Sequence, residues 1–325
     1  MSGAYVFIDR SQFPENVRRE LIDSLRTRAI NHKFHYDSYK QASKWLELHE
    51  AYSPARIDES CRRIYDNAYR AVLRNLRRNR INIVGLACGG GKKEARLLQL
   101  IVERGLECDY IASDVSLPLV LTAQATALPF LCESRCHLVV CDLATTESLA
   151  KNIDAVPASS DRIVTLFGIL PNFEPTALFP PIADLLRAND WLLVSANLAS
   201  GIDYGAGVQA VLPQYDNAPT RDWLMTLLLD LGFEREDGEV SFAIEIDARE
   251  LRRIVAHFEL KRPREIRIAD ERICFYGGER IRLFFSYRHT TRTISSIMAA
   301  HDLQIFDEWV NDSAEEGVYL CRKTR

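Results

Sequence analysis

Short runs of apolar residues recur along the middle of this chain, and segments with helical spacing separate them. The clearest run starts at Ile81 and breaks at Gly89 into a glycine turn, which leads into a predicted helix over residues 92–104. These runs are almost entirely apolar, as expected for parallel strands that helices cover on both faces. The alternation predicts an α/β protein with a doubly wound sheet. The other predicted elements of this region are strands at 108–113, 137–141, 163–167 and 191–197 and a helix at 176–187.

After Ser200 the alternation of predicted strands and helices is interrupted. Between residues 201 and 288 the pattern mixes a predicted helix at 220–231, an alternating strand at 241–246 and a glycine turn at 277–278. This mixture lacks the strand–helix rhythm of the preceding region. It therefore predicts a second domain of α+β type, inserted into the sheet domain.

The doubly wound pattern resumes near Thr290, which can cap a helix that runs through His301. Two closing strands follow, at 303–309 and 318–322, and we expect one of them to be antiparallel. The N-terminal segment is expected to join the inserted domain, with ligands enclosed between the two domains. The predicted division gives residues 58–200 and 289–325 to a cofactor-binding sheet domain, and residues 1–57 and 201–288 to a substrate-binding domain.

The glycine turn is the clearest candidate for a ligand-binding site. Gly85, Gly89 and Gly91 stand at the first strand-to-helix turn, where glycines let the backbone approach a ligand and a helix N-terminus offers free N–H groups. Asp114 ends the next strand, roughly 25 residues past the turn, near the distance expected of an acid that binds ribose hydroxyls. A nucleotide-like cofactor is therefore expected. The alternative is a turn that only packs helix on strand, with Asp114 capping the next helix.

Two kinds of cofactor use this turn. A dinucleotide fingerprint places a third glycine inside the helix, where this chain has Lys93 and Glu94, and this disfavours a nicotinamide-dependent oxidoreductase. The glycine spacing instead resembles the first motif of the class I methyltransferases, which bind S-adenosylmethionine and release S-adenosylhomocysteine. That resemblance implies that the turn, Lys93 and Asp114 hold the cofactor. It also implies that Asp142 and Leu143, after the third strand, hold the adenine.

Composition narrows the class of protein. The chain has 325 residues, a net charge of −4 and no basic stripe, so nucleic acid is not an expected partner. No apolar run is long enough to span a membrane and no signal peptide is recognisable, so we expect a cytoplasmic protein, monomeric or weakly oligomeric. The eight cysteines include one cluster, 132–141, whose side chains are expected to point apart. Reduced, mostly buried thiols are therefore predicted rather than a metal site.

Several motifs resemble the histidine-specific α-N-methyltransferases of ergothioneine biosynthesis. The segments K-F-H-Y-D at 33–37 and L-H-E-A-Y-S-P-A-R at 48–56 resemble that family's K-F-x-Y-D and L-P-E-Y-Y-P-T-R. Together the matching motifs cover most of the chain, and they imply the class I methyltransferase fold and S-adenosylmethionine as the cofactor. The other matches, in the same order as in the family, are L-F-G at 166–168 with P-N-F-E-P at 171–175, Q-Y-D-N at 214–217, A-I-E-I at 243–246 and the segment 279–288.

The resemblance also implies site residues. In that family a free amino acid donates its α-amino group to the sulfonium methyl. Each position has a plainer reading as well, because the tyrosines can be core or loop residues and Asn172 can be a turn residue or helix cap. The implied catalytic residues are Tyr36, Asn172 and Tyr215, and the implied substrate-binding residues are Tyr52, Ile246, Phe284 and Ser286.

One departure from the family concerns the substrate. In the family, an acidic residue two positions before the serine accepts a hydrogen bond from the histidine ring. Phe284 stands at that position here. An imidazole N–H that faces phenylalanine loses its partner at a cost of about 1–3 kcal/mol, whereas an aromatic pair adds about 0.5–1.5 kcal/mol. We therefore expect N-methylation of a small amino acid or amine with a less polar or aromatic side chain. The alternatives are a histidine methyltransferase with a remodelled pocket and a non-catalytic S-adenosylmethionine-binding protein.

Overall fold

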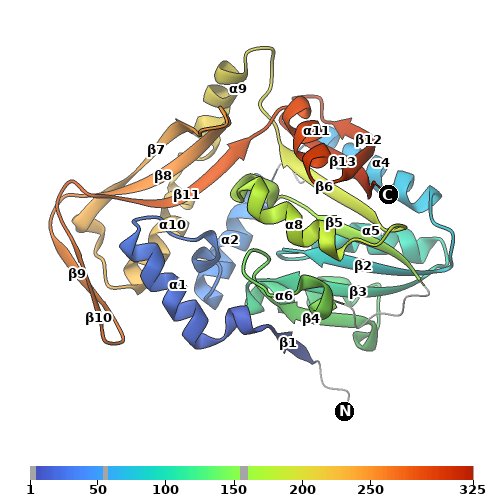
Figure 1. Cartoon of the computed structure of the whole chain (residues 1–325), viewed down its shortest axis with the longest axis horizontal. Coiled ribbons are helices and arrows are strands. Elements are labelled where there is room, and N and C mark those ends of the chain that lie inside the picture. The colour runs from blue at the N-terminus through green and yellow to red at the C-terminus, as the bar shows by residue number, and fades with distance from the viewer. Residues whose placement is uncertain (1–4, 54–57, 154–159, 325) are drawn as a thin grey trace. The chain divides into compact units, whose positions relative to one another are not determined.

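The computed structural model describes residues 5–53, 58–153 and 160–324, and the chain divides into two compact units (Figure 1). The first unit comprises Met1–Gln12, Ser53–Leu198 and His289–Arg325. The second comprises Phe13–Tyr52 and Ala199–Arg288.

Within the described residues, the first unit forms an eight-stranded sheet in the order β1-β4-β3-β2-β5-β6-β13-β12. Neighbours from β1 to β6 are parallel, whereas β13 runs antiparallel to both β6 and β12. The expected α/β class and the expected antiparallel closing strand are confirmed. The strands are β1 Val6–Ile8, β2 Arg80–Leu86, β3 Glu107–Asp114, β4 Cys136–Val140, β5 Asp161–Leu166, β6 Trp191–Asn197, β12 Leu303–Val310 and β13 Glu316–Lys323.

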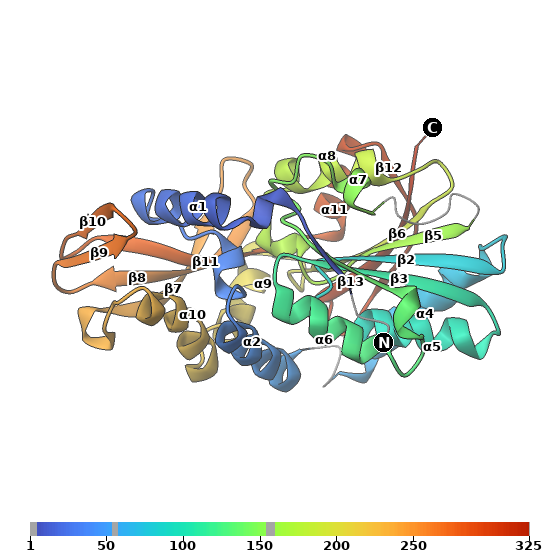
Figure 2. The ribbon, with the colours of Figure 1, turned by 90° about the horizontal axis from the view of Figure 1, so that it is seen from below.

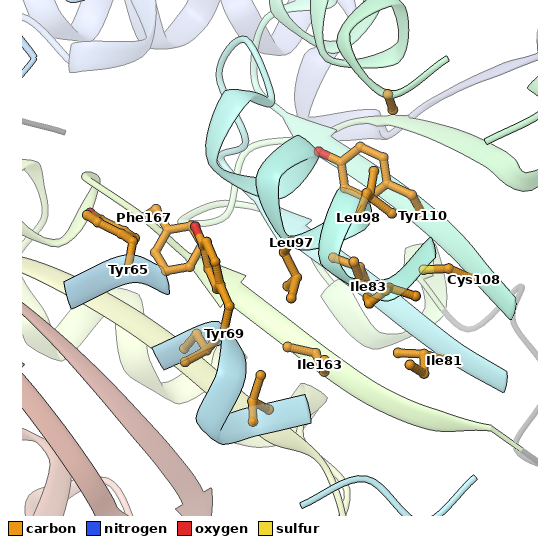
Figure 3. Packing of buried hydrophobic residues seen from close by; sticks show 14 of the residues in the cluster. Tyr65, Tyr69, Ile81, Ile83, Leu97, Leu98, Cys108, Tyr110, Ile163 and Phe167 are labelled. Carbon is orange, nitrogen blue, oxygen red and sulfur yellow. The ribbon is translucent and has the colours of Figure 1, made fainter. Parts of the chain in front are cut away.

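Helices cover both faces of this sheet (Figure 2). On β2, Ile81 and Ile83 pack among residues of α4, α5 and α6, as Figure 3 shows in part, whereas Val84 and Leu86 belong to the cluster formed with α7, α8 and α11. This double burial explains why the central strands are apolar throughout rather than alternating. The helices are α4 Glu59–Arg74, α5 Lys92–Glu103, α6 Leu117–Ala127, α7 Leu149–Ile153, α8 Pro175–Leu185 and α11 Thr291–Ala300.

The second unit combines helices with antiparallel strands. Its described strands form a three-stranded sheet in the order β11-β8-β7 and a β9–β10 hairpin. Residues 28–30 run along β11, because the Ile30 N–H donates to the Arg282 carbonyl and the Arg282 N–H to the Arg28 carbonyl. The elements are α1 Pro14–Arg26, α2 Tyr39–Tyr52, α9 Tyr204–Val211, α10 Ala218–Asp230, β7 Gly238–Ile246, β8 Arg252–Leu260, β9 Arg264–Ile268, β10 Glu271–Phe275 and β11 Arg280–Arg288.

Short 3-10 turns connect these elements. The cap at Thr290 is as expected, because its side chain accepts a hydrogen bond from the Thr293 N–H at the start of α11. The turns are η1 Arg10–Gln12, η2 His32–His35, η3 Glu133–Arg135, η4 Leu170–Asn172, η5 Leu212–Gln214 and η6 Arg235–Asp237.

Two features differ from the sequence-based expectation. The first is β1, which pairs with β4 of the large sheet, although residues 1–57 were expected in the other domain. A three-residue edge strand is too short to show periodicity. The second is the run of strands β8 to β11, where the sequence pattern predicted no strand. Arginines interrupt their apolar pattern, and a register shift between Arg282 and Phe284 breaks the alternation in β11.

Candidate functional site

The glycine turn lies between β2 and α5, at the carboxyl edge of the parallel sheet. Gly89 and Gly91 have φ of 54° and 69°, in the left-handed region that favours glycine. A Cβ on Gly91 would lie 2.9 Å from the Cα of Ala123, so α6 packs directly against this backbone. Gly85 lies inside β2, where a Cβ would approach the Tyr110 hydroxyl at 3.1 Å. The turn is therefore shaped by close packing as well as by backbone conformation.

Asp114 ties this turn to the end of β3. One carboxylate oxygen accepts the Gly89 N–H at 2.9 Å and the other accepts the Ser116 N–H at 3.0 Å. Burial raises the pKa of the Asp114 carboxyl to about 6. Ser116, and not Asp114, is the cap of α6, since its hydroxyl accepts the Leu119 N–H. The capping alternative for Asp114 is therefore wrong.

The other predicted cofactor residues follow neighbouring strands. Asp142 comes after β4 and is 4% exposed, with its carboxylate accepting the Ala144 N–H at 2.9 Å. Leu143 is also buried. Asn172 ends η4, after β5. The chain leaves β2 in one direction along the sheet and β5 in the other, so the carboxyl ends of these strands form a topological switch point, where ligands bind in such sheets.

Lys93, in the first turn of α5, lies in a polar cluster that no motif indicated. Its ammonium donates to the Tyr65 hydroxyl at 2.6 Å and lies 3.6 Å from a carboxylate oxygen of Glu316. Tyr65 in turn donates to Glu316, which is 251 residues away along the chain. Figure 3 shows Tyr65 beside Phe167, and the rings are 5.3 Å apart. Burial raises the pKa of the Tyr65 hydroxyl, which keeps it protonated and donating.

Three of the predicted substrate-side residues meet in one aromatic cluster of the second unit. Trp223, on α10, links two of them, because its ring centroid is 5.6 Å from that of Tyr36 and 6.1 Å from that of Phe284. The Tyr215 ring lies 6.0 Å from Phe284. Phe284 is only 8% exposed and belongs to the core cluster of this unit.

A polar network adjoins these rings. The Tyr215 hydroxyl lies 3.0 Å from the Ser286 hydroxyl and accepts a hydrogen bond from the Arg288 guanidinium at 2.9 Å. Ser286 and Arg288 are both buried. Because side chains alternate along a strand, Phe284, Ser286 and Arg288 share one face of β11.

The remaining two predicted residues are more exposed. Ile246, at the end of β7, is 57% exposed, and Tyr52, at the end of α2, is 50% exposed. Neither belongs to the aromatic cluster around Trp223. Residues 54–56, which complete the second family-like motif, lie outside the described residues.

Two buried histidines, missed by sequence reasoning, line the edge of β11. The His32 Nε2 accepts the Phe285 N–H at 3.2 Å, and the His35 Nε2 lies 2.7 Å from the Leu283 carbonyl oxygen. Burial lowers the pKa of His32 to about 3 and that of His35 to about 4, so both rings are neutral. Both follow Asn31 in η2, and their spacing matches no binding motif, so only the fold reveals their position.

Over the described parts of the chain, no group of three His, Cys, Asp or Glu side chains is arranged to hold a metal ion. All eight cysteines are free thiols, and Cys136 and Cys141 are buried. Among the described residues, no helix is both long enough and apolar enough to cross a membrane.

Solved structures with a similar fold share little sequence with this chain. A possible exported protein from Bordetella parapertussis gives a TM-score of 0.50 at 12% identity, covering 95% of this chain and 87% of that one. Magnesium protoporphyrin IX methyltransferase from Synechocystis PCC 6803, with bound S-adenosylhomocysteine, gives 0.43 at 12% identity and covers 88% and 95%. The 1,6-didemethyltoxoflavin-N1-methyltransferase of Burkholderia thailandensis gives 0.43 at 12% identity and covers 87% of each chain. No curated protein matches the sequence significantly.

The doubly wound sheet, its antiparallel β13 and the glycine turn at the switch point are those of a class I, S-adenosylmethionine-dependent methyltransferase. The sequence profile of the family described as "Histidine-specific methyltransferase, SAM-dependent" matches residues 17–323, and the chain belongs to this family. It is therefore a methyltransferase with S-adenosylmethionine as its cofactor, and the nicotinamide alternative is wrong.

Proposed function

We propose that this enzyme methylates the amino group of a small amino acid or amine whose side chain is less polar than histidine, or aromatic. The observation that carries this proposal is the packing of Phe284 against rings. Its ring centroid is 4.9 Å from that of His32 and 6.0 Å from that of Tyr215. A substrate imidazole placed against this cluster would lose the acceptor for its ring N–H, at about 1–3 kcal/mol.

We assign the cofactor to the first unit, through Gly85, Gly89, Gly91, Lys93, Asp114, Asp142 and Leu143. Substrate recognition is assigned to the second unit, through Tyr36, Tyr52, Tyr215, Ile246, Phe284 and Ser286. The support for the first assignment is the gathering of its residues at one sheet edge. The support for the second is the ring cluster that Tyr36, Tyr215 and Phe284 share and the Tyr215–Ser286 hydrogen bond, whereas Tyr52 and Ile246 are assigned from the family resemblance alone.

The reaction demands position more than covalent chemistry. S-adenosylmethionine bound at the glycine turn would supply a methyl group on sulfur; the lone pair of a neutral amine would form the new carbon–nitrogen bond as the carbon–sulfur bond breaks, with S-adenosylhomocysteine as the leaving group. The ammonium formed on the product then loses a proton to solvent. Most of the rate can come from holding the nitrogen about 3 Å from the methyl group, in line with the sulfur. Tyr36, Tyr215 and Asn172 are the proposed organisers, because hydroxyl and amide groups can hold an amino acid and accept from its amine.

The test is S-adenosylhomocysteine release from the full chain, measured over a panel of free amino acids and amines. Mass spectrometry of each product then locates the methyl group. Phenylalanine, tryptophan, leucine and histidine separate the ring and polarity requirements. We expect an apolar or aromatic member to be used best. Efficient use of histidine would favour the alternative, a histidine methyltransferase with a remodelled pocket, and cofactor binding without turnover would favour a non-catalytic protein.

A variant tests the proposed role of Asn172 separately. Asn172→Ala should lower turnover about 100-fold, the order of effect of a lost positioning contact, with little change in cofactor affinity. Asn75→Ala is the matched control, because Asn75 caps the far end of α4 in the same unit. A parallel loss of cofactor binding, or no loss of turnover, would return Asn172 to the role of a turn residue.

A further inference from the structure

A cavity of about 350 Å³ lies at the amino edge of the large sheet. Its lining comes from the residues before β2, the starts of β5 and β6 and the end of β13, all of which belong to the first unit. The glycine turn and Asp114 lie instead at the carboxyl ends of the parallel strands, and β5 alone spans about 20 Å between the two edges. The cavity is therefore separate from the candidate cofactor site.

The lining of this cavity, which we call the arginine cavity, is strongly basic. It contains five arginines and two aspartates, and it thus carries three positive charges in excess, whereas the whole chain has a net charge of −4. The arginines are Arg77, Arg78, Arg162, Arg187 and Arg322. Because this excess surrounds one concave surface, it attracts anions locally.

The two aspartates hold the chain segments that shape the arginine cavity. Asp190 accepts a hydrogen bond from the Arg162 side chain at 2.8 Å. Asp161 accepts from the backbone N–H groups of Arg77 and Arg78. A backbone hydrogen bond survives replacement of the side chain, so the Arg77 side chain can be varied without releasing Asp161.

Arg322, near the end of β13, is held in a defined orientation. Its guanidinium carbon lies 4.1 Å from the centroid of the Trp191 ring, which is buried and packs on Phe306. The Arg322 Nε is buried and has no hydrogen-bond partner among the described residues. A buried donor without a partner is unfavourable, and an acceptor bound beside it would relieve this cost. The stacked guanidinium is also preorganised, so less side-chain freedom is lost when it binds a ligand.

We propose that the arginine cavity is a binding site for a small molecule that carries a phosphate or diphosphate group. Guanidinium groups bind such oxyanions through paired hydrogen bonds, and the excess of three charges matches a multiply charged anion better than a single carboxylate. The volume of the cavity lies in the range of small-molecule sites, about 300–1,000 Å³. A nucleic acid would need a basic stripe that continues beyond the cavity, and the chain carries a net negative charge.

The ligand of this site is not the methyl acceptor, because the cavity lies at the edge of the sheet opposite the glycine turn. A ligand that binds only the folded first unit raises the free energy of unfolding. The site is thus independent of the proposed function, and occupancy should be visible as added stability.

Isothermal titration calorimetry of the full chain with pyrophosphate and with inorganic phosphate tests the site, at a constant ionic strength set by chloride. The enzyme is first saturated with S-adenosylhomocysteine, because the helix N-terminus at the glycine turn also attracts anions. We expect one saturable site per chain, with pyrophosphate bound more tightly than phosphate. The midpoint of thermal unfolding should rise with the concentration of the anion.

Two variants locate the bound anion. Arg322→Met keeps an apolar stem over Trp191 but removes the fork, and it should weaken pyrophosphate binding about 10- to 100-fold, the effect of losing a charge-assisted contact. Arg77→Met removes an exposed guanidinium and should weaken binding about 2- to 5-fold. Arg322→Lys should fall between Arg322→Met and the unmodified enzyme, because it keeps the charge without the planar fork.

Arg104→Met is the matched control. Arg104 is exposed at the C-terminal end of α5 in the same unit and does not line the cavity, so its replacement should leave pyrophosphate affinity nearly unchanged. The affinity of each variant for S-adenosylhomocysteine reports whether the first unit is folded, and Arg77→Met carries the test if Arg322→Met does not fold. A lack of saturable binding by the unmodified enzyme would overturn the site. Equal weakening by Arg104→Met, or no weakening by any folded cavity variant, would overturn it as well.

Discussion

The carboxyl edge of the large sheet and the three-stranded sheet of the second unit hold their predicted site residues by different means. At the sheet edge the backbone is constrained, with Gly89 and Gly91 in the left-handed region and Asp114 bonded to the Gly89 N–H. On β11 the side chains are constrained by packing, with Phe284 enclosed by rings. Few residue types satisfy a backbone constraint, whereas many apolar side chains satisfy a packing constraint. Cofactor recognition is therefore expected to tolerate little change, and substrate recognition more.

The largest effect should come from the turn itself. Gly91→Ala combines a left-handed φ, which costs about 1–2 kcal/mol, with overpacking of about 1–3 kcal/mol where the new Cβ meets Ala123. We expect the free energy of unfolding to fall by about 2–5 kcal/mol and cofactor binding to be lost, as measured by denaturant unfolding and calorimetry.

Gly105→Ala is the matched control. Gly105 has a similar φ of 70°, but a Cβ there would meet nothing within 4 Å. It should cost only the strain, about 1–2 kcal/mol, and leave cofactor affinity unchanged. Equal effects of the two substitutions would show that packing against α6 does not shape the turn.

The next effect concerns Asp114. Asp114→Ala should weaken S-adenosylmethionine binding by about 1.5–3 kcal/mol, as expected for lost charge-assisted hydrogen bonds to the ribose. The raised pKa, about 6, adds a pH signature, because the carboxyl becomes protonated below that value. Cofactor affinity should therefore fall as the pH is lowered through about 6, by up to 10-fold per pH unit. Titration calorimetry of Asp114→Asn, which cannot ionise, should show this dependence removed; its persistence would place the titrating group elsewhere.

The sequence predicts the first region better than the second for the same physical reason. Glycines at fixed spacing and an acid at the end of a strand are local signals, and apolar runs located the central strands of the large sheet to within about two residues. Lys93 was predicted, but its partners Tyr65 and Glu316 come from α4 and β13 and carry no local signal. In the same way, the sequence pattern did not distinguish Arg288 from the other arginines of β8 to β11. Only the fold brings its guanidinium into hydrogen-bond contact with the Tyr215 hydroxyl.

A specificity exchange tests the second region. Phe284→Glu should shift preference toward a substrate that bears an imidazole, because it supplies an acceptor for the ring N–H and places a carboxylate against any apolar ring. The change in relative kcat/KM should be about 10- to 100-fold, corresponding to about 1–3 kcal/mol. Competition between histidine and the best panel substrate measures it directly. Phe284→Leu is the control that alters packing without adding charge. Efficient use of histidine by the unmodified enzyme, with no effect of Phe284→Glu, would show that Phe284 does not contact the side chain of the substrate.

The smallest effect should appear in the pH dependence of stability. His32 and His35 have folded-state pKa values of about 3 and about 4, below the ordinary value of 6.5, because they are buried. The unfolded chain therefore binds protons more readily, and stability that is present above pH 6.5 is lost as the pH falls. Each histidine should contribute a loss of about 0.7 kcal/mol between pH 7 and pH 6. Protonation would also remove the His32 acceptor for the Phe285 N–H, so His32 ties this loss to the edge of β11.

The measurement is the difference in unfolding free energy between the unmodified enzyme and His32→Gln at each pH, which cancels the other titrating groups. Glutamine keeps an acceptor for the Phe285 N–H but does not titrate, so the variant should lose less stability on acidification, by about 0.7 kcal/mol over that pH unit. Parallel pH profiles would mean that the His32 ring is open to solvent when the protein is folded. The hydrogen bond from the Phe285 N–H to His32 would then contribute little to holding the edge of β11. In that case the backbone of β11, and not only its side-chain packing, would be less constrained than the backbone of the glycine turn.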